Sequence, residues 1–268
     1  ARTLLGAFAI LILSAALVLS RTRAAWLALA VWGLVALPLA WRGRATIAAA
    51  LAPRRGPLLI AALAAGAVLA LILPNALDWR SDSPYLDSVR GVVNYREGSG
   101  AGRVKQYLNS LKLVRRHPVL GVGPGNWAAE YPAVVARSDP SLTDATGMTA
   151  NPWPSSDWIA ALAERGVPAA VALAAFVLLL LAGAWRSWTD IALSAGARLG
   201  ALAGGSVVLI GAVEGSFDAV ALLAFPSIIL WVSAGALIPR GQVIGERRIT
   251  RRARGYLTGA VAIAWCAI

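Results

Sequence analysis

The segment from Arg103 to Gly166 decides the fold because it lies in the only long stretch without an apolar run of membrane length. It opens with RVKQYLNSLKLVRRHPVLGVGPGN (residues 103–126), passes through a polar region, and ends with NPWPSSDWIAALAERG (residues 151–166). The chain on both sides consists of apolar runs of roughly 20 residues, the length that crosses the hydrocarbon core of a bilayer. We therefore expect a polar insert, carrying any chemistry, on a set of membrane helices.

The composition is that of a polytopic membrane protein. The chain has 268 residues, 58% of them hydrophobic, and a mean hydropathy of +0.67. Because backbone polar groups must be satisfied internally in lipid, such spans predict an all-α transmembrane helix bundle. The net charge of +12 comes almost wholly from arginine, since Lys105 and Lys112 are the only lysines. These arginines gather at the ends of apolar runs, which favours topology signals over a nucleic-acid partner.

Cysteine and histidine are scarce in the sequence. Cys266 is the only cysteine, which excludes an intrachain disulfide and a CxxC metal site. His117 is the only histidine, which excludes a multi-histidine metal site. We therefore expect neither a metal nor a cofactor.

The apolar runs predict six spans and the start of a seventh. The six cover residues 4–19, 24–41, 58–77, 167–184, 199–213 and 219–238, and the seventh begins at Tyr256. This divides the chain into three membrane helices (1–77), an extracytoplasmic loop domain with short amphipathic helices (78–166), and the remaining spans (167–268). Both termini lie at or inside apolar runs, so we expect a piece of one larger membrane domain with spans missing on both sides.

The arginines predict the orientation of the chain. If the spans alternate, twelve of them fall on one side, which the positive-inside rule makes cytoplasmic: Arg42, Arg44, Arg54, Arg55, Arg186, Arg198, Arg240, Arg247, Arg248, Arg251, Arg252 and Arg254. The insert then faces outward. Arg21 and Arg23 break the rule, because they lie in a short turn on the outer side. Either they snorkel to lipid headgroups, or they form a cationic pocket for an anionic ligand.

The first part of the insert predicts an amphipathic helix. Apolar and aromatic residues recur at helical spacing between residues 104 and 114, with polar residues on the other face. We expect this helix to lie against the outer leaflet or to cap the helix bundle. Arg103 stands at its start, after the flexible segment Gly98–Gly102. It is either one more solvated charge or a side chain that reaches a phosphate.

Two further stretches of the insert are informative. Gly121–Asn126 has glycines like those of a dinucleotide-binding loop, but Pro124 interrupts it and no βαβ unit surrounds it, so a turn between two helices is favoured. Asn151–Asp157 predicts a rigid approach to a helix that Ser155 or Ser156 caps, with Asp157 in the first turn. We expect the N-terminus of that helix to form an anion site, with Ser155 and Ser156 offering hydroxyls to the ligand.

These motifs together resemble the O-antigen ligase and O-antigen polymerase family of bacterial envelope glycosyltransferases. Four patterns match in order: Ser20-Arg21 with Ala24-Ala25-Trp26-Leu27; Gly98-Ser99-Gly100 followed by Arg103; His117 to Asn126, the most specific; and Asp157 to Gly166, with its Ala-Glu-x-Gly ending. The resemblance covers essentially the whole chain.

The resemblance implies a metal-independent membrane glycosyltransferase of the GT-C type at the outer face of the bacterial inner membrane. Its donor is an undecaprenyl-diphosphate-linked glycan, and its acceptor is a lipid or a sugar. By pattern, the two arginines that bind the diphosphate fall on Arg21 and Arg103, with Arg23 a weaker candidate. Arginine suits a diphosphate because its guanidinium matches phosphate oxygens bidentately and keeps its charge.

The sequence departs from the family at one position. Counting back from Glu164, Ser155 stands where the family has the histidine thought to act as base, and Ser156 stands where it has an asparagine. A serine hydroxyl is no base near neutral pH. Either Asp157 or Asp218 serves as the base, or departure of the leaving group carries the reaction. The remaining alternative is a non-catalytic binder or transporter of a lipid-linked glycan, so the sequence leaves catalysis open.

Overall fold

The computed structural model describes residues 2–50, 55–72, 84–93, 98–139, 141–142, 149 and 151–237. These residues form helices joined by turns, with a single isolated β-bridge between Leu142 and Thr149. The helices are α1 (Arg2–Ser20), α2 (Arg23–Arg42), α3 (Arg44–Ala50), α4 (Arg55–Ile72), α5 (Pro84–Val93), α6 (Gly98–Arg116), α7 (Trp127–Glu130), the 3₁₀ helix η1 (Tyr131–Val134), α8 (Asp157–Thr189), α9 (Ala195–Glu214) and α10 (Ala224–Leu237).

Five of these helices are long and apolar enough to cross a membrane: α1, α2, α4, α8 and α9. The predicted all-α polytopic membrane fold is therefore confirmed. α10 is also apolar, but it begins at Ala224 and is therefore shorter than the predicted span 219–238. The predicted seventh span and residues 73–77 of the third lie outside the described residues. The sequence did not predict the short helix α3.

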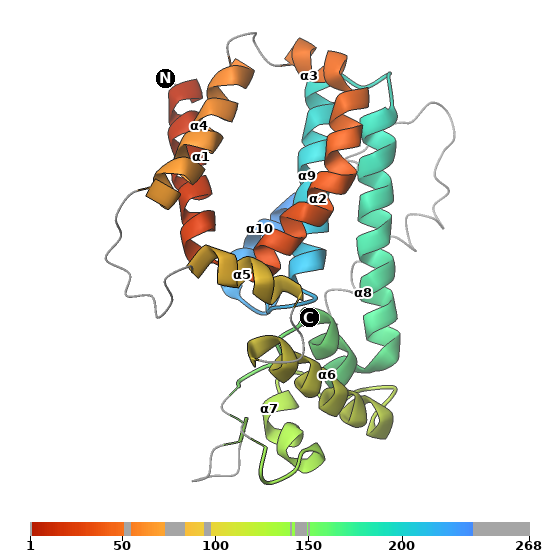
Figure 1. The fold of residues 1–268 in the computed structure, drawn as a ribbon. Coiled ribbons are helices and arrows are strands. Elements are labelled where there is room, and N and C mark those ends of the chain that lie inside the picture. Colours follow the sequence, from red (N-terminus) through yellow and green to blue (C-terminus); the bar gives the residue numbers. More distant parts are fainter. Residues whose placement is uncertain are drawn as a thin grey trace, which may run out of the picture.

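The membrane helices form two groups, as Figure 1 shows: α1 packs against α4, and α9 packs against α2, α8 and α10. Small residues allow the close approach in both groups. A Cβ on Gly205 of α9 would meet the Cβ of Ala184 at 2.7 Å, and one on Gly66 of α4 would collide with the backbone of Leu11.

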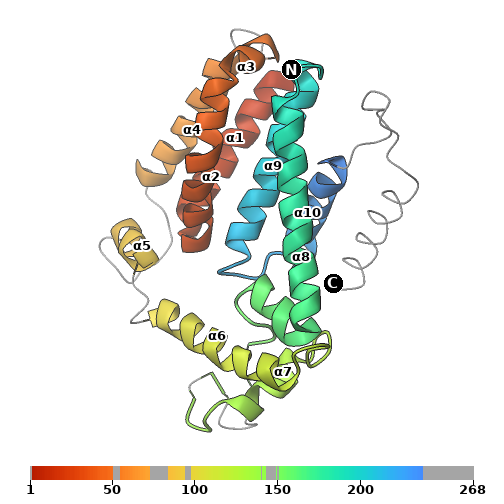
Figure 2. The ribbon, with the colours of Figure 1, turned by 90° about the vertical axis from the view of Figure 1, so that its right-hand side faces the viewer.

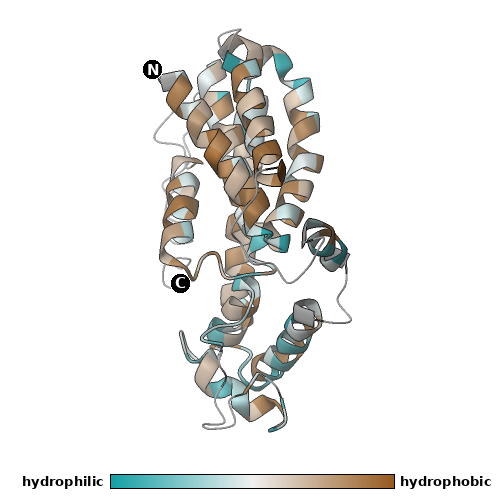
Figure 3. Cartoon of the chain, turned by 60° about the vertical axis from the view of Figure 1, so that its left-hand side comes forward, coloured by the Kyte–Doolittle hydropathy of each residue, from teal (hydrophilic) through white to brown (hydrophobic). Residues whose placement is uncertain are grey.

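The helix ends that carry Arg42, Arg44 and Arg55 lie at the opposite end of the bundle from the insert. α2 ends and α3 begins at arginines on the end of the bundle where α4 also begins, whereas α5, α6 and α7 lie at the opposite end (Figures 1 and 2). Figure 3 shows a mostly apolar bundle with more hydrophilic residues in the insert. The predicted segregation of Arg42, Arg44 and Arg55 from the insert is thus reproduced in the fold.

Helix α6 is present, but it begins at Gly98, so the segment Gly98–Gly102 that was expected to be flexible forms its first turn. The packing of α6 also differs from the simple amphipathic pattern. Leu113 and Val114 are buried, whereas Val104, Leu108 and Leu111 are exposed. The reason is that polar side chains on the buried face form hydrogen bonds inside the insert. The Ser110 hydroxyl, for example, accepts a 2.9 Å hydrogen bond from the indole N–H of Trp127.

Helix α8 bends sharply at Gly166, where φ is 81° and ψ is 175°. The residues before the bend form the predicted helix after Asn151–Asp157, and those after it form the predicted fourth span. The glycine-rich turn between α6 and α7 is bonded to this bend: Val122 N–H donates to the Ala163 carbonyl, and Gly123 N–H to the Glu164 carbonyl, both at 2.9 Å. The interpretation of Gly121–Asn126 as a turn between two helices is confirmed.

Candidate functional site

A polar cavity of about 400 Å³ opens in the insert, beside the N-terminal half of α6. Its described lining includes two residues that the sequence analysis singled out, Arg103 from α6 and Ser155 from the segment before α8. Lys105, Gln106 and Asn151 contribute further polar groups. The cavity therefore joins an arginine to hydroxyl and amide groups, a combination that suits a polar, anionic ligand.

The backbone of Ser155 is fixed on both sides by α6. Its N–H donates to the side-chain oxygen of Gln106 at 2.8 Å. Its carbonyl accepts a 2.5 Å hydrogen bond from the hydroxyl of Tyr107, which also lies 3.1 Å from the carbonyl of Ser216. These contacts hold Ser155 at the cavity wall and join α6 to the turn between α9 and α10.

Arg103 forms an ion pair with a residue far away in the sequence. Its guanidinium lies 3.6 Å from the carboxylate of Asp218, and the two side chains are 31% and 47% exposed. Asp218 also accepts a 2.9 Å hydrogen bond from the N–H of Ala219. A half-exposed carboxylate thus lies beside the arginine of the polar cavity.

Ser156 and Asp157 connect α8 to the α9–α10 turn. Ser156 caps α8 by accepting the N–H of Ile159 at 3.4 Å, as predicted, and donates to the Gly215 carbonyl at 3.0 Å. The Asp157 carboxylate accepts the N–H groups of Val220 at 3.0 Å and Ala221 at 2.8 Å. These hydrogen bonds explain why residues 219–223 form a turn rather than the first turn of α10.

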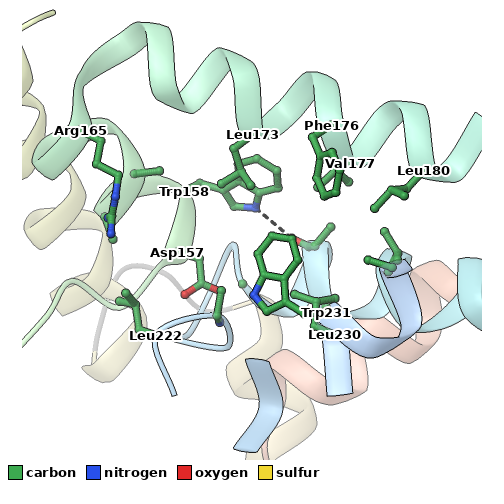
Figure 4. A pocket seen from close by; sticks show the side chains of 18 residues that line it. Asp157, Trp158, Arg165, Leu173, Phe176, Val177, Leu180, Leu222, Leu230 and Trp231 are labelled. Carbon is green, nitrogen blue, oxygen red and sulfur yellow. Dashed lines mark hydrogen bonds between the residues drawn. The ribbon is translucent and has the colours of Figure 1, made fainter. Parts of the chain in front are cut away.

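Asp157 also borders an apolar groove between α8, α9 and α10 (Figure 4). Trp158 and Phe176 of α8 and Trp231 of α10 line the groove, and the Trp158 indole N–H donates to the Ala212 carbonyl at 2.9 Å. Arg165 lies at one end of the row of labelled side chains and Leu180 at the other. The lining offers an apolar environment along the membrane part of α8.

Arg21 and Arg23 occupy the turn between α1 and α2 and contact α5. The side-chain Nε of Arg21 donates to the Ser88 hydroxyl at 2.9 Å, and a guanidinium nitrogen of Arg23 donates to the Gly91 carbonyl at 3.3 Å. Arg21 has a positive φ of 53°, which is uncommon for a residue with a side chain. Neither arginine is among the described residues that line the polar cavity.

Asp139 is an acidic residue among those that line the polar cavity. Its burial favours the neutral acid, but hydrogen bonds from the N–H and hydroxyl of Ser141 and the nearby Lys105 ammonium outweigh burial and lower its pKa. Its carboxylate lies 3.1 Å from Lys105. Asp139 is therefore a structural anion that holds Lys105 at the cavity. Across the described part of the chain, no three His, Cys, Asp or Glu side chains gather as a metal site would require.

Sequence reasoning missed the residues that support the site. Tyr107 lies one helical turn after Arg103, so i, i+4 spacing places both on one face of α6 and could have indicated it. Gln106, Asn151 and Asp139 carry no comparable signal, because their roles depend on contacts between segments far apart in the chain.

Comparisons with known proteins agree with the membrane fold and the motifs. The family model described as O-antigen ligase matches residues 8–174, which include most of α1, the whole of α2, the insert and the bend of α8. No curated protein and no solved structure matches the chain. Because the family model covers more than half of the 268 residues, this integral membrane protein belongs to the O-antigen ligase family.

Proposed function

We propose that this protein transfers a glycan from an undecaprenyl-diphosphate carrier to a lipid or sugar acceptor at the outer face of the bacterial inner membrane. The observation that carries the proposal is the polar cavity at the insert end of the bundle, which Arg103 and Ser155 both line. Membership of the O-antigen ligase family supports a glycan as the substrate.

In this proposal Arg103 binds the diphosphate of the donor. Its guanidinium is partly exposed and already holds an anion, the Asp218 carboxylate, at 3.6 Å. A diphosphate carries more charge and offers more oxygens to a planar guanidinium than a single carboxylate does. Donor binding would therefore displace Asp218 from Arg103.

Arg21 and, more weakly, Arg23 are proposed to contact the carrier from the α1–α2 turn. The positive φ of Arg21 is a backbone strain of the kind that clusters at ligand sites. Their contacts with Ser88 and Gly91 of α5 hold both side chains at the insert end of the bundle. This position at the insert end supports a role for both arginines at the carrier headgroup.

The proposed transfer exchanges one carbon–oxygen bond for another. The acceptor hydroxyl oxygen attacks the anomeric carbon of the donor sugar, and the bond from that carbon to the diphosphate oxygen breaks. The diphosphate leaves with the carrier lipid and keeps the bonding electrons. Arg103 stabilises the negative charge that develops on the diphosphate. The proton of the acceptor hydroxyl passes to a carboxylate and then to water.

Of the two candidate carboxylates, Asp218 fits the role of base better than Asp157. Two backbone N–H groups occupy the Asp157 carboxylate, which borders the apolar groove and is not among the described residues that line the polar cavity. Asp218 is 47% exposed beside Arg103 and would be released when the diphosphate arrives. Ser155 then contributes a hydroxyl to the cavity wall, and Ser156 caps the helix that follows it.

The orientation is tested with reporter fusions on both sides of the membrane. A fusion at Arg44 should read cytoplasmic, and a fusion at Ser138, in the insert, should read external, because positively charged ends stay in the cytoplasm. The same reading from both positions would contradict the proposed orientation.

The activity is tested by a transfer assay on the full-length protein in vesicles with a fluorescent lipid-linked oligosaccharide. Wild type should transfer the glycan, and Asp218→Asn should lower the rate by about 100-fold or more, the contribution typical of a general base. Asp190→Asn is the matched control, because Asp190 accepts a local backbone N–H in the turn after α8, away from the cavity. Equal rates for wild type and both variants would remove Asp218 from the mechanism.

A non-catalytic binder or transporter of the same lipid-linked glycan is the second candidate function. It is favoured by Ser155, which stands in the position of the family's histidine. In that case the full-length protein binds the donor but releases no transferred product, and Asp218→Asn cannot lower a transfer rate that is already zero. The transfer assay run beside a donor-binding measurement separates the two candidates.

A further inference from the structure

We propose that the turn after α6 is a membrane anchor, in which Val119 and Leu120 enter the bilayer interface and Arg115 and Arg116 face anionic lipid phosphates. The side chains of Val119 and Leu120 are 62% and 81% exposed. In a membrane protein, two neighbouring exposed apolar side chains at the end of a span are candidates for lipid contact.

The turn holds these side chains rigidly. Val167 N–H donates to the Pro118 carbonyl at 2.8 Å, and Gly121 N–H donates to the His117 carbonyl at 3.0 Å. A Cβ on Gly166 would collide with the carbonyl oxygen of Val119, so the two backbones touch. Val119 and Leu120 therefore cannot fold back into the insert without breaking contacts to α8.

The same contacts fix the depth of the turn. The apolar part of α8 runs from Val167 to Trp185, and at a rise of about 1.5 Å per residue it spans roughly 30 Å, the thickness of the hydrocarbon core. Gly166 then lies at the boundary of the hydrocarbon, and the turn bonded to it lies in the interface. Val167 and Val171 are 41% and 61% exposed at the start of this span, so the apolar surface is continuous with the lipid-facing side of α8.

The arginines beside the turn indicate that the lipid headgroup region contacts this surface. Arg115 and Arg116 end α6 and are exposed. Arginines next to inserted apolar side chains attract the phosphates of anionic lipids. A soluble protein partner would have to share this narrow layer with lipid, so we commit to the bilayer interface.

The backbone contacts between the turn and the bend of α8 also connect the anchor to the cavity. If the turn is held in the interface, the helix before Gly166 is fixed relative to the membrane, and with it Ser155 at the cavity wall. The inference concerns the membrane contact alone and does not depend on which reaction the cavity carries out.

The test is spin-label accessibility in the full-length protein with Cys266→Ser and any other native cysteines replaced, in phosphatidylcholine vesicles with and without phosphatidylglycerol. A label at Leu120→Cys should be relaxed more by molecular oxygen, which concentrates in lipid, than by a water-soluble nickel chelate. A label at Ser138→Cys is the control, because Ser138 is exposed in the insert beyond η1 and should show the reverse.

Two results would overturn the anchor. One is a label at position 120 that is as accessible to the nickel chelate as the label at position 138. The other is an immobilised label that neither reagent reaches, which would mean that protein covers the turn. A separate comparison tests the role of Arg115 and Arg116. Phosphatidylglycerol should move the label at position 120 deeper into the bilayer, and the double variant Arg115→Gln, Arg116→Gln should abolish that shift. The same depth in both lipids before any substitution would refute the role of the arginines.

Discussion

The Arg103 guanidinium of α6 lies 3.6 Å from the Asp218 carboxylate in the α9–α10 turn, so one ion pair joins the insert to the membrane bundle. Both side chains are partly exposed, and Arg103 also lines the polar cavity. A partly solvated pair of this kind contributes about 1 kcal/mol or less to stability. The ion pair matters for function, because an anionic donor would compete with Asp218 for Arg103.

The first prediction concerns the charge of Arg103. Arg103→Ala should weaken donor binding by about 1.5–3 kcal/mol, the range for a hydrogen bond to a charged group. Arg103→Lys should restore only part of this, because an ammonium lacks the planar pair of donors. The measurement is the Kd of a lipid-linked oligosaccharide in detergent, with Arg137→Ala, an exposed arginine elsewhere in the insert, as the control. Unchanged affinity in Arg103→Ala would remove it from the donor site.

The second prediction separates a binding role from a structural role for Arg21. Arg21→Ala should lower donor affinity, whereas Ser88→Ala should leave it nearly unchanged. Ser88→Ala removes the hydroxyl that accepts from Arg21 at 2.9 Å but keeps the guanidinium. Both variants should lose a similar, small amount of thermal stability. Donor affinity that falls equally in the two variants would mean that Arg21 only holds α5.

The third prediction concerns the bend of α8. Gly166→Ala should destabilise the protein by roughly 1–3 kcal/mol, because a φ of 81° with a ψ of 175° is a conformation essentially limited to glycine. The added Cβ would also collide with the Val119 carbonyl oxygen. Gly183→Ala is the matched control on the same helix, since a Cβ there has no neighbour within 4 Å. Thermal unfolding followed by tryptophan fluorescence measures both, and equal midpoints would contradict the account of the bend.

The fourth prediction restores the family's histidine. Ser155→His should raise the transfer rate by at least about 10-fold, since a positioned general base typically contributes 10²–10⁴-fold. Asn151→His is the control, because it places an imidazole in the same cavity at a different position. The measurement is the transfer assay with the fluorescent donor. A gain in both variants, or in neither, would mean that position 155 has no special relation to the reacting atoms.

The sequence predicted the membrane part of the fold well, because apolar runs and arginines act locally. The first span at residues 4–19 corresponds to α1, and the fifth at 199–213 corresponds to α9. The late start of α10 could not be predicted, because it depends on the Asp157 carboxylate binding N–H groups more than sixty residues away. The burial of polar Ser110 on α6 has the same kind of cause, a partner on another element.

The candidate site was predictable only in part. The motifs indicated Arg103 and Ser155, and the structure brings both to one cavity. The pairing of Arg103 with Asp218 depends on how α6 packs beside the α9–α10 turn, which no local pattern encodes. The hydrogen bonds of Arg21 to Ser88 and of Arg23 to Gly91 likewise depend on the docking of α5 against α2.

The central claim is that the polar cavity holds the lipid-linked glycan, and photo-crosslinking tests it most directly. A photoreactive amino acid replaces Asn151 in the cavity, and a second variant carries it at Asp190 in the turn after α8, away from the cavity. With a fluorescent lipid-linked oligosaccharide, we expect a crosslink from position 151 that excess unlabelled donor abolishes, and none from position 190. No donor-specific crosslink at position 151, or equal crosslinking at the two positions, would contradict the proposed site.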